Sequence, residues 1–247
     1  MKARLSGITN CTKSIIEIKE VMFIFIDGID GAGKSTLIRS LHESLGSGRD
    51  TCEVIKFPSR NPTPRERVTP LARTLFFLKD FEETMHRAPA SMYNPEAAFI
   101  FDRTFISTMA YQGFNKNGVG GNSFNSAHPR FDAIFSLGAE ALLRGSALHD
   151  IYFVHLRCDP EVAATRILGR GDNTGDEIDA IKDKDALVDR LSILEDRINL
   201  SYAHVRLNMK RLDVQSYTKN YHFITLDSTH VDTATLVEDM GILLAKG

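Results

Sequence analysis

Eight consecutive residues near the start of the chain have the types and spacing of a phosphate-binding loop. Residues 28–35 are Gly-Ile-Asp-Gly-Ala-Gly-Lys-Ser, the pattern G-x-x-x-x-G-K-S. Glycines let backbone N–H groups curl around a phosphate, and a following helix N-terminus adds partial positive charge. Lys34 is expected to reach the β- and γ-phosphates of a nucleoside triphosphate, and the Ser35 hydroxyl to ligate Mg²⁺. The predicted nucleotide-contacting residues are Gly28, Gly31, Ala32, Gly33, Lys34, Ser35 and Thr36.

The elements on either side of this loop support the motif. Residues 22–26 form an apolar run typical of a buried strand, and residues 36–45 carry apolar side chains at helical spacing. Further short apolar runs alternate with helical patterns at 53–57, 98–101, 151–156 and 222–226. This alternation predicts an α/β fold with a P-loop and a five-stranded parallel sheet flanked by helices.

Composition excludes several classes of protein. At 247 residues, with 43% hydrophobic and 25% charged residues, the chain fits one globular domain. A net charge of −2 argues against nucleic-acid binding, and no apolar run approaches the roughly 20 residues of a membrane span. Three scattered cysteines lack metal-ligand spacing and favour reduced thiols. We therefore expect a cytoplasmic protein that binds neither nucleic acid nor membrane.

The first twenty residues have two interpretations. They contain Lys2, Arg4 and Lys13, with no acidic residue before Glu17, which would suit a weak organelle-targeting peptide. The alternative, which we favour, is a disordered extension ahead of the working protein. A single domain is expected over residues 21–247.

A second strand ends in residues suited to phosphate chemistry. The apolar run before Asp102 and Arg103 predicts that both reach the carboxyl edge of the sheet. In a P-loop protein such an acid lies beside the Mg²⁺ site, and an arginine can hold a second anionic group. The D-x-x-G and N-K-x-D elements of a GTPase are missing at suitable places. The pattern therefore favours a site for two phosphate-bearing substrates.

Three segments together resemble thymidylate kinases. They are residues 25–36, the pattern Asp102-Arg103-x-x-x-Ser107-x-x-Ala110-Tyr111-Gln112-Gly113, and Phe57-Pro58-Ser59-Arg60. The resemblance covers about residues 21 to 235. It implies a P-loop nucleoside monophosphate kinase that uses ATP and Mg²⁺ to convert dTMP into dTDP. Because family members are commonly homodimers, a homodimer is also a possibility.

The resemblance assigns roles to individual residues. Asp30 is similar to the family's acid that contacts the acceptor sugar, and Arg60 and Arg103 are similar to arginines that grip the acceptor phosphate. A guanidinium fork suits that role better than lysine. Tyr111 matches a tyrosine that disfavours a ribose 2′-hydroxyl. The other predicted acceptor contacts are Phe57, Ser107, Thr108 and Gln112, and the predicted metal ligands are Ser35 and Asp102.

A glycine-rich segment after a helix is typical of a mobile lid. Asp159-Pro160-Glu161 predicts a helix start, with the helix running to about Leu168. A lid would then cover about residues 166–180; a solvated connection is the alternative. Because the P-loop lacks an arginine, the resemblance implies that the lid supplies one. Arg166 and Arg170 are the candidates, and Arg170 is the less favoured because glycines flank it.

The acceptor base is less well determined. Thymidylate kinases stack a phenylalanine on the base and reach a base carbonyl with an arginine one turn later. Phe76 fits the stacking position, but Asp80 stands where the arginine belongs. An ionised aspartate only accepts hydrogen bonds, which would suit cytosine or guanine. Alternatively Asp80 faces solvent and Arg73 supplies the donor; dTMP remains the most expected acceptor.

Two other functions compete with this interpretation. A deoxynucleoside kinase would need a general base for a sugar hydroxyl, whereas Arg60 and Arg103 suit an acceptor that already bears a phosphate. A catalytically inactive nucleotide-binding protein would not require Lys34, Ser35 and Asp102 together.

Overall fold

The computed structural model describes most of the chain. The described ranges are 21–47, 51–63, 69–87, 97–114, 130–145, 150–170, 181–212 and 221–244. The N-terminal extension over residues 1–20 lies outside them, as do residues 171–180 of the predicted lid.

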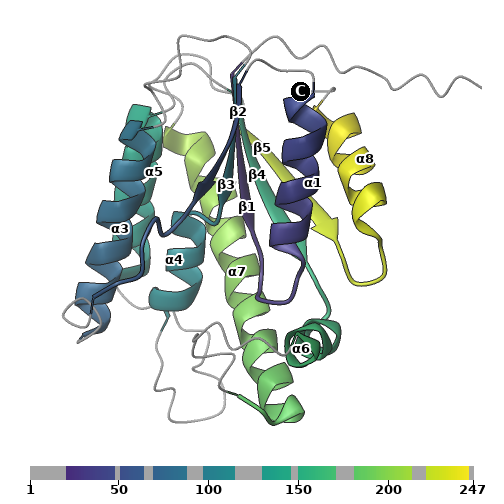
Figure 1. Cartoon of the computed structure of the whole chain (residues 1–247). Coiled ribbons are helices and arrows are strands. Elements are labelled where there is room, and N and C mark those ends of the chain that lie inside the picture. Colours follow the sequence, from purple (N-terminus) through teal and green to yellow (C-terminus); the bar gives the residue numbers. More distant parts are fainter. Residues whose placement is uncertain are drawn as a thin grey trace, which may run out of the picture.

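Five parallel strands form a single sheet in the order β2-β3-β1-β4-β5 (Figure 1). The strands are β1 (Met22–Asp27), β2 (Thr51–Lys56), β3 (Ala97–Asp102), β4 (Asp150–Arg157) and β5 (Tyr221–Asp227). The predicted fold is therefore confirmed. Each predicted strand is present, and its ends lie within two residues of the expected ones.

Helices cover both faces of the sheet. Figure 1 shows α1 and α8 on one face, α3, α4, α5 and α7 on the other, and α6 below the carboxyl ends of the strands. Their bounds are α1 (Lys34–Gly46), α3 (Pro70–Arg87), α4 (Phe105–Gln112), α5 (Arg130–Gly145), α6 (Pro160–Gly169), α7 (Lys184–Leu212) and α8 (Thr233–Leu244). No helix within the described ranges combines the length and apolar content needed to cross a bilayer.

The centre of the sheet explains why its strands are continuous apolar runs. Every residue of β1 is buried, as expected for a parallel strand covered on both faces. On one face, aromatic rings stack from strand to strand: Phe25 lies 4.4 Å from Phe101 and 5.5 Å from Phe153, centroid to centroid. Since β1 is central, the loop that follows it leaves from the middle of the carboxyl edge.

The segment around α6 follows its predicted start and end. The Asp159 carboxylate caps the helix by accepting hydrogen bonds from the N–H groups of Glu161 and Val162. The helix ends at Gly169, so Arg170 lies just beyond it. The first residues of the predicted lid thus belong to a helix anchored at the carboxyl edge.

Candidate active site

The P-loop, residues 28–35, joins the end of β1 to the first turn of α1. Lys34 is buried, and its ammonium donates hydrogen bonds to the carbonyls of Gly28 (2.9 Å) and Ile29 (2.8 Å). The N-cap residue Gly33 has no side chain with which to cap α1. The first N–H groups of the helix can therefore face an anion.

The P-loop packs closely against neighbouring segments. Gly31 has a φ of 83°, which glycine adopts readily, and a Cβ there would lie 2.5 Å from the Ala163 carbonyl oxygen of α6. The carbonyl of the buried Ala32 accepts a hydrogen bond of 2.7 Å from Ser228 Oγ. Ser228, which sequence reasoning missed, follows β5. The P-loop therefore rests against α6 and the turn after β5.

One carboxylate of the P-loop connects the two halves of the predicted site. Asp30 forms an ion pair with Arg103, and its Oδ1 lies 3.7 Å from Lys34 Nζ. The Tyr111 hydroxyl donates to the other Asp30 oxygen at 3.3 Å, and the Arg103 guanidinium carbon lies 5.6 Å from the centre of the Tyr111 ring. The structure thus brings together four predicted site residues from the P-loop, α1, the end of β3 and α4.

These contacts shift the pKa values of the site. Burial alone would raise the pKa of Asp30, but the charges of Arg103 and Lys34 outweigh it and lower the pKa to about 2. Burial lowers the pKa of Lys34 from 10.5 to about 8, helped by the charge of Arg103 and opposed by Asp30. Burial and the charge of Asp30 raise the pKa of Tyr111. At neutral pH the site therefore holds an aspartate anion, a lysine cation and a neutral phenol.

The backbone of Arg103 is unusual. Its φ is 77°, in the left-handed region that side chains with a Cβ rarely adopt, and its N–H donates to the Ile26 carbonyl at 3.0 Å. The strand β3 thus ends in a sharp change of direction beside β1. This conformation places the guanidinium against Asp30.

Asp102 and Ser35 have the chemistry of a magnesium site. Asp102 ends β3 beside Ile26 of β1, is half-buried, and its charge acts on both Lys34 and Arg103. Ser35 is exposed on the first turn of α1. Mg²⁺ prefers such hard oxygen ligands, usually one or two from the protein with the rest from phosphates and water. The residues therefore fit the predicted metal. In the described part of the chain, three or more His, Cys, Asp or Glu side chains nowhere gather into a metal-binding group.

The loop after β2 carries the predicted acceptor arginine. Phe57 is 2% exposed and packs edge-on against Phe81 of α3, at 5.4 Å between centroids. Its ring therefore anchors the start of the loop in the core, and a contact of Phe57 with an acceptor stays a prediction. Arg60 is exposed, and its guanidinium carbon lies 4.5 Å from the centre of the Phe76 ring. The Arg60 and Phe76 side chains are thus in contact, and their roles toward an acceptor stay predictions.

Asp80 is buried and is held by Ser59. It is 5% exposed, so the alternative that it faces solvent is wrong. Its two carboxylate oxygens accept hydrogen bonds from the N–H and the hydroxyl of Ser59, at 2.7 and 2.5 Å. Both oxygens are thus engaged by Ser59, and a contact of Asp80 with the acceptor base stays a prediction. Arg73 is half-buried in the first turn of α3, and its role as a substitute donor stays a prediction.

Sequence reasoning missed a buried carboxylate at the end of β1. Asp27 is fully buried and accepts hydrogen bonds from the N–H (3.0 Å) and hydroxyl (2.7 Å) of Thr104 and from the Ser107 hydroxyl (2.5 Å). The Tyr202 hydroxyl of α7 donates to it at 3.5 Å. An acid at the end of a buried strand is the same signal that indicated Asp102. Here it ties β1 to the start of α4 and to α7.

We predict that Asp27 contributes strongly to stability. Asp27→Ala is expected to lower the free energy of unfolding by about 3 kcal/mol, because it leaves the Thr104 N–H and three hydroxyls without their acceptor. Urea or thermal unfolding measures this change. Asp196→Ala, at an exposed position of α7, is the control and is expected to change stability by less than about 0.5 kcal/mol. Equal effects of the two variants would contradict the assignment.

The remaining predicted acceptor contacts are residues of α4. Thr108 and Gln112 are buried, and the Ser107 hydroxyl proton points to Asp27. Tyr111 is more exposed than these three. The helix thus presents Tyr111 to the site, and direct contacts of the other three with an acceptor stay predictions.

The two lid arginines differ in their surroundings. Arg166 donates hydrogen bonds to the carbonyls of Gly31 (3.3 Å) and Ser228 (2.8 Å), and to Cys158 Sγ (3.3 Å). It therefore lies against the P-loop but would have to leave these partners to approach a γ-phosphate. Arg170 is exposed beyond the end of α6. A catalytic role for either arginine stays a prediction.

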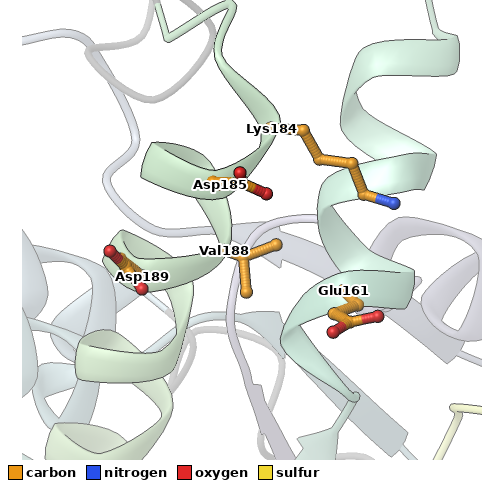
Figure 2. Close-up of a pocket in the computed structure, with 5 residues that line it drawn as sticks. All are labelled: Glu161, Lys184, Asp185, Val188 and Asp189. Atoms are coloured by element: carbon orange, nitrogen blue, oxygen red, sulfur yellow. The ribbon is translucent and has the colours of Figure 1, made fainter.

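A pocket of about 310 Å³ lies between α6 and α7 (Figure 2). It is lined by Glu161, Lys184, Asp185, Val188 and Asp189. None of these is a predicted site residue, and three of the five are acidic, which disfavours a phosphate. We therefore place the candidate site at the P-loop and not in this pocket.

Comparisons with known proteins agree with this geometry. A family model described as thymidylate kinase matches residues 26–190. The thymidylate kinase of Chlorobium chlorochromatii (strain CaD3) is 30% identical over 159 residues, 60% of this chain and 65% of that protein. The thymidylate kinase of Xylella fastidiosa (strain 9a5c) is 37% identical over 101 residues, 37% of this chain and 48% of that protein. The alignments to the first relatives therefore span about half to two thirds of their length.

Proposed function

Because the chain belongs to the thymidylate kinase family, we propose that it transfers the γ-phosphate of ATP to dTMP, giving ADP and dTDP. The observation that carries this proposal is the position of Asp30. A single P-loop carboxylate contacts Lys34, suited to a donor phosphate, and Arg103, suited to an acceptor phosphate. A phosphoryl group can be transferred directly only where two such binding sites adjoin.

On the donor side, the P-loop would bind the triphosphate through backbone N–H groups and Lys34. The Lys34 ammonium, which donates to the Gly28 and Ile29 carbonyls, would turn to the β- and γ-phosphates. Ser35 and Asp102 would hold Mg²⁺, which would supply positive charge to the phosphates during transfer. Arg166 or Arg170 would add positive charge from the lid.

On the acceptor side, Arg103 and Arg60 would hold the monophosphate. Arg103 is oriented by Asp30 and by the ring of Tyr111, so its guanidinium fork is largely fixed before the acceptor arrives. Phe76 would stack on the base, and Tyr111 would stand near the sugar. The chemistry then consists of positioning and charge stabilisation.

A nucleoside acceptor is less well supported. Its hydroxyl would need a general base whose pKa lies near the working pH. Asp30, the carboxylate held between Lys34 and Arg103, has a pKa of about 2 and is a weak base. An acceptor that already carries a phosphate needs no such base and can use both arginines.

We expect dTMP to be the best acceptor. ATP turnover measured with dTMP, dUMP, dCMP, dGMP and thymidine, each with and without Mg²⁺, tests this prediction. Because both Asp80 oxygens already accept hydrogen bonds from Ser59, we expect dCMP and dGMP to gain little from it. Turnover that requires thymidine in place of dTMP would support a nucleoside kinase, and no turnover with any acceptor would support an inactive nucleotide-binding protein. Loss of dTMP turnover in Arg73→Ala would support the substitute donor.

The cellular context is also part of the proposal. The described Cys158 is a buried thiol, in keeping with a reducing compartment. We propose a cytoplasmic enzyme of small-molecule nucleotides, acting as a monomer or a homodimer. Size-exclusion chromatography with light scattering distinguishes the two states.

A further inference from the structure

We propose that Asp80 is a positioning residue for the acceptor phosphate: its buried carboxylate fixes Ser59 and thereby orients Arg60. This inference rests on the proposed function, in which Arg60 contacts the acceptor. It assigns to Asp80 a task within the protein and not at the base.

The hydrogen bonds of Asp80 are directed at a single residue of the acceptor loop, residues 57–60. One oxygen accepts from the Ser59 backbone N–H and the other from the Ser59 hydroxyl. Ser59 lies 21 residues before Asp80 and is itself exposed. A buried carboxylate is costly to keep without partners, and these two donors satisfy it. The buried Asp80 carboxylate therefore fixes the position of the exposed Ser59.

Other contacts of the loop show why this bond matters for Arg60. Phe57 is fixed in the core by Phe81, so the start of the loop is immobilised. Arg60, three residues later, is exposed and contacts the face of Phe76. Ser59 is the link between them. With the Ser59 N–H fixed, the backbone direction entering Arg60 is set, and a rigid starting point reduces the entropy lost when the guanidinium binds an anion.

Three residues of α3 contact the acceptor loop. Phe76 and Asp80 lie one turn apart and Phe81 follows Asp80 directly, and all three side chains contact the loop. Each holds a different residue of the loop: Arg60, Ser59 and Phe57 respectively. Helix α3 therefore fixes the conformation of the acceptor loop through these three contacts.

Kinetics of an Asp80 series test the proposal. Asp80→Ala is expected to raise the KM for dTMP by about 10- to 100-fold, the loss of two hydrogen bonds to a charged group, while the KM for ATP stays within about twofold. Asp80→Asn retains one acceptor oxygen and should rescue most of this loss. Glu82→Ala removes an exposed carboxylate from the same helix and is the matched control. Should Asp80→Ala not fold, Ser59→Ala removes only the hydroxyl bond and is expected to raise the dTMP KM by a smaller factor.

A double-mutant cycle with Arg60→Ala separates positioning from general destabilisation. If Asp80 acts through Arg60, Asp80→Ala should add little to the KM for dTMP once Arg60 is gone. Additive effects, or equal increases in the KM for ATP and dTMP, would overturn the proposal. If the wild type turns over dTMP and Asp80→Ala matches it, the positioning role alone is wrong. If the wild type turns over no monophosphate, the proposed function fails and this inference falls with it.

Discussion

Lys34→Met is expected to lower kcat/KM for ATP by about 10²- to 10³-fold, the range found when one preorganised charge-stabilising donor is removed from an active site. Lys34 is the first residue of α1, and its buried ammonium donates hydrogen bonds to the Gly28 and Ile29 carbonyls. A triphosphate offers stronger partners in the same place. Steady-state kinetics with ATP varied at saturating dTMP measures the loss.

The pKa of Lys34 predicts how this step depends on pH. In the free protein burial lowers that pKa to about 8, so the ammonium is present below pH 8 and is lost above it. We therefore expect kcat/KM for ATP to fall above about pH 8. The unfolded chain keeps its proton to about pH 10.5, so between pH 8 and 10.5 it binds more protons than the folded chain. The contribution of Lys34 to stability consequently rises in that window.

Above pH 8, deprotonation of Lys34 is expected to lower activity but to raise stability, so measuring both provides a control. If deprotonation of Lys34 causes the loss, kcat/KM for ATP should fall between pH 8 and 9 while the midpoint of thermal unfolding shows no matching decrease. Lys34→Arg, which stays protonated, should have low activity without the fall above pH 8. A parallel loss of activity and thermal stability, or a pH profile of Lys34→Arg like that of the wild type, would contradict the assignment.

Patterns that repeat along the chain could be predicted from the sequence. The central strands β1, β3 and β4 are buried on both faces, so each is a nearly continuous apolar run that stands out from amphipathic helices. The P-loop was predictable for a different reason: phosphate binding restricts residue types at fixed spacing. Asp102 and Arg103 were placed correctly at the carboxyl edge because they follow a buried strand directly.

Contacts between distant segments could not be predicted in this way. Ser59 and Asp80 meet only because α3 packs beneath the loop after β2, at a distance and rotation that depend on the rings of Phe57 and Phe81. The carbonyl partners of Arg166 likewise come from segments far from it in the chain. Residue types indicate which chemistry is possible, whereas tertiary packing decides which partner each side chain takes.

Arg103→Ala is expected to lower kcat/KM for dTMP by about 10²- to 10³-fold, since it removes one partner of a half-buried charge pair that we propose also holds the acceptor phosphate. Arg103→Lys keeps a charge but not the planar fork, and an intermediate loss is expected. The KM for ATP should change less, because Lys34 and the P-loop remain. An unchanged dTMP KM in Arg103→Ala would exclude Arg103 as the acceptor clamp.

The backbone of Arg103 allows a second and independent test. At ordinary φ, alanine is more stabilising than glycine by about 0.5–1 kcal/mol. At the φ of 77° of Arg103, the order should reverse, because the Cβ of alanine is disfavoured there by about 1–2 kcal/mol. Urea unfolding of Arg103→Gly and Arg103→Ala should therefore find the glycine variant the more stable by about 1 kcal/mol, with both equally poor as enzymes. Greater stability of the alanine variant would mean that the turn does not hold this conformation. The expected order would show that the chain keeps a strained residue here at a cost in stability, which is what the proposed role of the Arg103 guanidinium toward an acceptor phosphate requires, since glycine cannot supply that group.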